Sequence, residues 1–158
     1  MNTSQNDKVA VYQSVYDDVS RRPACEIIEN ILRNNCFANG NRYFTNIIVA
    51  AAEIVDSMLR GERVVGVFEK AAQRLDNTSN AKAIERSVRC AIKTAWQRAA
   101  KSDMLDKTTI LSMYPVTPTA GSFLRDVANK AYLEIKARIE AAETSGDGIG
   151  DVPNAPAD

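Results

Sequence analysis

Apolar residues recur every three to four positions along most of the chain, which is the spacing of one face of an α-helix. One such segment runs from Arg42 to Arg60, and its wide apolar surface predicts a central helix with neighbours on several sides. Further amphipathic helices are expected over 25–34, 64–75, 81–99, 102–113 and 120–142. We therefore predict an all-α, bundle-like domain of about six helices.

Composition divides the chain into three parts. Residues 1–23 are predicted to form a short N-terminal arm, partly disordered, and residues 24–143 the helical domain. The Gly-, Pro- and Asp-rich stretch 144–158 is predicted to be a disordered tail. The N-terminus lacks the form of a signal peptide, and apolar runs fall short of the roughly 18 residues of a membrane helix. We expect a cytoplasmic protein without a membrane partner.

The segments 64–75 and 81–99 are joined by a short polar turn. The connecting residues, Asp76 to Asn80, all favour turns or helix N-caps. Two amphipathic helices joined in this way are the sequence form of a helix-turn-helix, the motif that places its second helix in the major groove of DNA. Many helical hairpins look similar, so the pattern is a hypothesis that needs further support.

The second of these helices has two contrasting sides. Its apolar sector holds Ile84, Val88, Ala91, Ile92 and Ala95. A second sector of about 60°, pointing roughly the opposite way, holds four cations: Lys82, Arg86, Arg89 and Lys93. Solvated helix faces usually mix charges of both signs, whereas this row is flanked by a single acid, Glu85. We expect the apolar side to pack on a core and the cationic side to meet a partner.

Charge is distributed unevenly although the formal net charge is zero. Residues 60–101 hold ten Lys/Arg and four Asp/Glu, a net of +6; residues 1–59 hold five and seven, a net of −2; residues 102–158 hold five and nine, a net of −4. The positive charge thus coincides with the predicted helix-turn-helix. Such a patch attracts a phosphate backbone while the rest of the surface limits non-specific binding.

The same stretch resembles the DNA-binding helix-turn-helix of the sporulation initiation factor A family, the master sporulation response regulators of spore-forming Firmicutes. The matching residues are Ile84-Glu85-Arg86, Ser87-Val88, Arg89, Ala91-Ile92 and Ala95-Trp96, then Pro118-Thr119, Phe123, Val127-Ala128 and Lys130, and more weakly Ile27-Ile28, Gly40, Tyr43 and Ile48. The resemblance covers roughly Ala24 to Glu140, the whole C-terminal effector domain of the family. Cys90 stands where the family has His, and the turn is about two residues longer. A receiver domain precedes the effector domain in the family; about 23 residues precede it here, so we expect no control by phosphorylation.

The residue types suggest which side chains would read bases. Arg86 and Arg89 lie one turn apart and suit the O6 and N7 edges of guanine, while Glu85 would either accept from cytosine N4 or orient an Arg. The resemblance implies that these three residues are the base contacts and that the target resembles a short box such as TGTCGAA. We therefore expect a sequence-specific, nucleoid-associated bacterial transcription regulator.

Other residues of the motif are expected to contact the DNA backbone. Lys82 and Lys93, at the two ends of the cationic row, would meet phosphates, as would the hydroxyls of Thr78 and Ser79 in the turn. The resemblance also implies a homodimer on double-stranded DNA, formed through the C-terminal helix around 132–139.

Two other classes of function compete with DNA binding. A helical interaction module would keep the fold and modulate another regulator without reading DNA, a reading that the neutral net charge and the missing receiver favour. An enzyme is disfavoured because the chain has no His and no nucleophile–base set can be assembled.

The cysteines, Cys25, Cys36 and Cys90, form no C-x-x-C motif, so we expect neither a metal site nor a cofactor.

Overall fold

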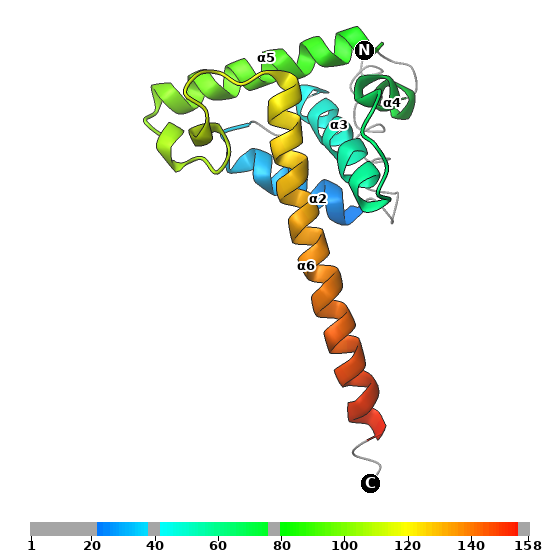
Figure 1. The fold of residues 1–158 in the computed structure, drawn as a ribbon. Coiled ribbons are helices and arrows are strands. Elements are labelled where there is room, and N and C mark those ends of the chain that lie inside the picture. Colours follow the sequence, from blue (N-terminus) through cyan, green and yellow to red (C-terminus); the bar gives the residue numbers. More distant parts are fainter. Residues whose placement is uncertain (1–21, 38–41, 76–79, 155–158) are drawn as a thin grey trace, which may run out of the picture.

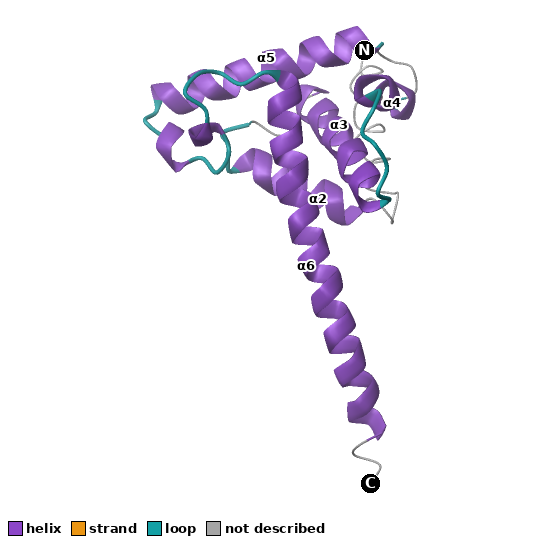
Figure 2. Ribbon diagram, viewed as in Figure 1, coloured by secondary structure: helices purple, strands orange, loops and turns teal. Residues whose placement is uncertain are grey.

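The computed structural model describes residues 22–37, 42–75 and 80–154. These ranges contain five α-helices and no strand (Figures 1 and 2). The helices are α2 (Arg22–Arg33), α3 (Arg42–Leu59), α4 (Val67–Arg74), α5 (Ala81–Lys101) and α6 (Ala120–Asn154), with two short 3-10 helices, η1 (Leu105–Lys107) and η2 (Leu111–Met113). The all-α prediction is therefore confirmed over the described residues. The N-terminal arm up to residue 21 lies outside them.

Helix α3 is the centre of the domain, with α2, α4, α5 and α6 packed around it (Figure 1). Every residue from 44 to 55 is buried, which accounts for the wide apolar surface seen in the sequence. The largest fully buried side chains of this core include Phe44, Ile47 and Ile48 on α3 and Phe123 and Leu124 on α6. None of the helices in the described ranges combines the length and apolar character that a membrane span requires.

Helix α4 begins three residues later than expected. The predicted range 64–75 includes Val64, but Val64 is 39% exposed and the helix starts at Val67. Gly66, the residue before it, has a φ of 59°, a left-handed conformation that favours glycine and interrupts a right-handed helix. The segment between α3 and α4 is therefore a connection with exposed valines rather than the first turn of α4.

The predicted helix over 102–113 is wrong, because this segment forms the two 3-10 helices instead. The hydroxyl of Thr108 donates to the carbonyl of Leu105 at 2.7 Å and accepts from the backbone N–H of Ser112 at 2.9 Å. Such side-chain bonds compete with the α-helical backbone pattern. Asp103, just after α5, has a φ of 56° and turns the chain away from the helix axis.

Asn35 joins the end of α2 to this irregular segment. Its Nδ2 donates to the carbonyl of Ile31 at 2.7 Å and to Oγ1 of Thr109 at 2.9 Å. Its Oδ1 accepts from the backbone N–H groups of Ile110 and Leu111 at 2.8 and 2.9 Å. Asn35 is fully buried, and these four bonds use all the hydrogen-bonding capacity that a buried amide must satisfy.

Helix α6 is longer than predicted. Thr119 caps it by accepting from the backbone N–H of Ser122 at 3.2 Å. Its buried stripe ends at Ile135, and the helix then continues away from the body of the domain to Asn154 (Figure 1). The tail expected to be disordered is thus helical over 144–154. Gly146, Gly148, Gly150 and Pro153 have low helix propensity, so local composition does not account for this extension.

Candidate nucleic-acid interface

Helix α5 begins at the predicted turn and has a defined cap. Asn80 is extended, and its Oδ1 accepts from the backbone N–H of Ala83 at 2.8 Å, which satisfies one of the free donors at the helix N-terminus. Its 21 residues span about 31 Å at 1.5 Å per residue. The proposed phosphate contacts Thr78 and Ser79 lie outside the described residues.

The inner side of α5 is anchored in the core. Its buried residues are Ile84, Val88, Ile92, Ala95 and Ala99, each at most 1% exposed. This confirms the predicted burial of Ile84, Val88 and Ile92. Helix α4 packs against α5, with Leu75 at its end buried and Phe68 half-buried against the core. The core therefore fixes the rotation of α5 about its axis, and with it the direction of the outer side.

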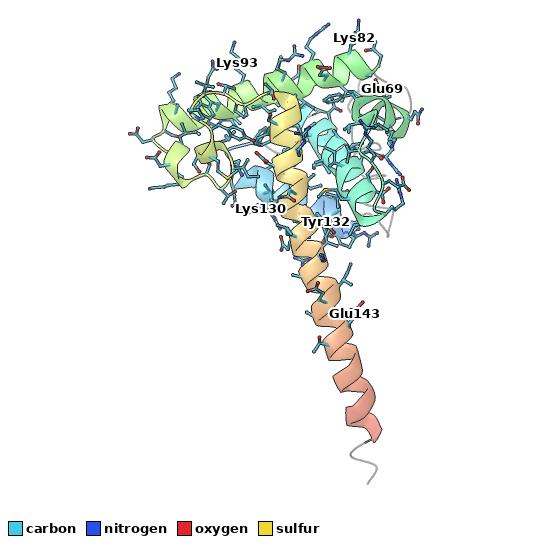
Figure 3. All side chains as sticks on the ribbon, in the orientation of Figure 1. Glu69, Lys82, Lys93, Lys130, Tyr132 and Glu143 are labelled. Carbon is cyan, nitrogen blue, oxygen red and sulfur yellow. The ribbon has the colours of Figure 1, made fainter. Side chains whose placement is uncertain are left out.

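The four cations of the outer side are all exposed: Lys82, Arg86, Arg89 and Lys93. Figure 3 shows Lys82 and Lys93 projecting from the same edge of α5, away from the body of the domain. Lys82, Arg86 and Lys93 form no ion pair with any residue that the structure describes. We call these four side chains the cationic row. The geometry leaves the row open to a partner along more than three helical turns.

Glu85 forms an ion pair with Arg89 within the helix. Arg89 Nη2 lies 3.1 Å from Glu85 Oε2, and the side chains are 63% and 42% exposed. An exposed pair at this spacing contributes roughly 0.3–0.5 kcal/mol. In the free protein Glu85 is thus paired with Arg89, while Arg86 has no ion-pair partner in the described ranges.

Two other cations of the 60–101 region, Arg60 and Arg74, form ion pairs away from α5. Arg60, at the end of α3, pairs with Asp56 and with Glu62, whose Oε1 lies 2.9 Å from Arg60 Nε. Arg74, in the last turn of α4, pairs with Glu53. These pairs lower the local positive charge around α3 and α4. The uncompensated part of the cationic excess therefore lies largely on α5.

An ion pair between Glu53 and Arg74 joins α3 to α4, the first helix of the predicted helix-turn-helix. The sequence analysis did not predict this pair. Glu53 is 5% exposed and lies on α3, and Arg74 lies just before the connection from α4 to α5. A carboxylate that remains charged in such a place needs a partner. The acid stands inside the apolar run Ala50 to Val55, and that was the available signal for a buried pair.

Arg98 is a cation of α5 that does not belong to the outer side. Its Nη1 donates to the backbone carbonyl of Cys36 at 2.8 Å, which ties the second half of α5 to the end of α2. Cys25 is buried, Cys36 is half-buried and Cys90, on α5, is exposed. Cys90 is exposed because its position on α5 lies next to the cationic row.

Comparison of the chain with protein-family models, with curated proteins and with solved structures found no match. The resemblance to the sporulation regulators, and the base and phosphate contacts that follow from it, therefore stay predictions.

Proposed function

We propose that this chain is a sequence-specific bacterial DNA-binding transcription regulator, related to the effector domain of the sporulation response regulators. In this proposal α4 and α5 form the helix-turn-helix, and α5 enters the major groove with Glu85, Arg86 and Arg89 facing the bases. The observation that carries the proposal is the cationic row, which is exposed along a helix whose opposite side is buried in the core.

The positions of the cations along α5 support a division of labour. Arg86 and Arg89 lie in the first half of the helix, the part that approaches base edges in helix-turn-helix proteins. Lys82 and Lys93 lie on either side of them and suit the phosphates that border the groove. A guanidinium donates two parallel hydrogen bonds to guanine, whereas an ammonium acts as a point charge, so the residue types agree with these places.

We also propose that two copies pair on DNA through α6. Beyond Ile135 the helix leaves the body, and Leu133 and Ile139 are 55% and 47% exposed. Lys136 and Arg138 lie between them and are exposed, with Arg138 Nη2 3.0 Å from Glu134 Oε1. At about 100° per residue, Leu133 and Ile139 lie about 120° apart around the helix, with Lys136 midway between them. A second copy that covers both apolar side chains would therefore also cover the stem of Lys136.

Selection of bound duplexes from a random library tests the proposed function. The full chain is incubated with the library at 100 mM salt, and bound duplexes are amplified and sequenced over several rounds. We expect enrichment of a box that contains guanines within a few base pairs of one another. A library that stays random while binding persists would show backbone binding without readout. No binding at low salt would favour the interaction module instead.

A further inference from the structure

A pocket of about 250 Å³ lies between the second half of α5, the start of α3 and the residues that follow α2. Figure 1 shows the N-terminal end of α3 approaching α5 from the inner side. Aromatic rings form one part of the wall, from Phe37, Tyr43 and Phe44, and two small side chains of α5, Ala91 and Ala95, leave the space open. The pocket is therefore mainly apolar and wide enough for a ring.

Among the described residues of this wall, Arg98 carries the charge and Thr94 adds a hydroxyl. One N–H of the guanidinium donates to the carbonyl of Cys36 at 2.8 Å, which holds the side chain at the edge of the pocket. Arginine has five N–H donors in a planar fork, and the others have no partner among the described residues. An otherwise apolar pocket thus offers a held cation with donors to spare.

We propose that this pocket binds a small aromatic carboxylate, with its ring beside Tyr43 and Phe37, which are 42% and 8% exposed, and its carboxylate on Arg98. The size agrees, because a cavity of about 150 Å³ accepts benzene, so this larger pocket has room for one ring or two fused rings with a carboxylate. The charge agrees as well, because Arg binds carboxylates through two parallel hydrogen bonds. Strongly hydrated anions such as sugar phosphates are disfavoured by the aromatic wall.

The proposal goes beyond DNA binding and does not depend on it, so its test contains no DNA. Calorimetric titration of the full chain compares indole-3-carboxylate with indole, which has the same rings and lacks the charge. We expect the carboxylate to bind at least ten-fold more tightly. Equal affinity of the two probes, or no binding of either at millimolar concentration, would overturn the proposal without any variant being needed.

Two variants locate the site. Arg98→Gln keeps a donor for the carbonyl of Cys36 but removes the charge, so it should reduce the affinity for indole-3-carboxylate to that for indole and leave indole binding unchanged. Lys101→Gln is the matched control, an exposed cation three residues further along α5 and outside the pocket wall. Ala91→Leu fills the space and should abolish binding of both probes. Retained carboxylate preference in Arg98→Gln would place the ligand elsewhere and refute the assignment.

Discussion

Replacing Arg89 with Ala separates base reading from attraction to phosphates. A bidentate contact between Arg and guanine contributes about 1–3 kcal/mol of discrimination between bases. This corresponds to a loss of about 5- to 150-fold in affinity for the selected box, because each 1.4 kcal/mol is ten-fold. Affinity for random duplexes should change little, because most of them present no guanine at the position that Arg89 reads in the box.

The structure sets what else this substitution removes. Arg89 is 63% exposed, and its ion pair with Glu85 contributes roughly 0.3–0.5 kcal/mol to stability. The free energy of unfolding should therefore change by less than about 0.5 kcal/mol, so weaker binding would not reflect unfolding. The substitution also leaves the carboxylate of Glu85 unpaired on the DNA-facing side. The double variant Glu85→Ala with Arg89→Ala should regain part of the lost affinity, which a double-mutant cycle would measure.

Lys93→Ala is the matched control. Lys93 is exposed, lies one turn beyond Arg89 and has no ion-pair partner in the described ranges. Its loss should weaken binding to the selected box and to random duplexes equally, and lower the slope of log K against log salt by about one unit. Fluorescence anisotropy with both duplexes between 50 and 200 mM salt is the assay. Equal effects of Arg89→Ala and Lys93→Ala on both duplexes would refute base reading by α5.

Three further predictions concern the core, the assembly and pH. Leu75→Ala should lower the free energy of unfolding by about 2–5 kcal/mol, and Phe68→Ala, half-buried, by less than the roughly 3–5 kcal/mol of a fully buried ring; denaturant titration checks both. Lys136→Glu with Arg138→Glu should leave stability intact and reduce cooperativity on a two-box duplex; unchanged cooperativity would count against pairing through α6. Burial, together with a hydrogen bond to the carboxylate of Asp126 on α6, raises the pKa of Tyr114 above its ordinary value of about 10. The stability that this hydroxyl contributes is therefore present below about pH 10 and lost as the pH rises further. Tyr114→Phe should reduce this loss of stability at high pH, which thermal unfolding measures.

Features that depend on local periodicity could be predicted from the sequence. The burial of Ile84, Val88 and Ile92 and the exposure of the cationic row both follow from the 3.6-residue repeat of one helix. The capping residue of α5 was also within reach, because a run of five turn-forming residues had to contain it. The rotation of α5, and therefore the outer side of the candidate interface, was in this sense encoded locally.

Features that depend on distant partners could not be predicted in this way. Glu53 and Arg74 are 21 positions apart, and Arg98 and Cys36 are 62 apart. Periodicity assigns each of these side chains to a face of its own helix but carries no information about the residue opposite. The prediction of an α-helix over 102–113 was wrong for a different, local reason. Hydroxyl groups such as that of Thr108 form hydrogen bonds with the backbone that compete with the α-helical pattern.

The buried amide of Asn35 has a consequence for how the chain folds. It connects residues that are 74 to 76 positions apart, with α3, α4 and α5 between them in the chain, so we expect α2 and the 3-10 segment to become ordered together. Closing a loop of that length costs entropy that no local contact repays, which places this step late in folding. Two fragments produced by cutting between α4 and α5 should be unstructured when separate and should regain helicity when mixed.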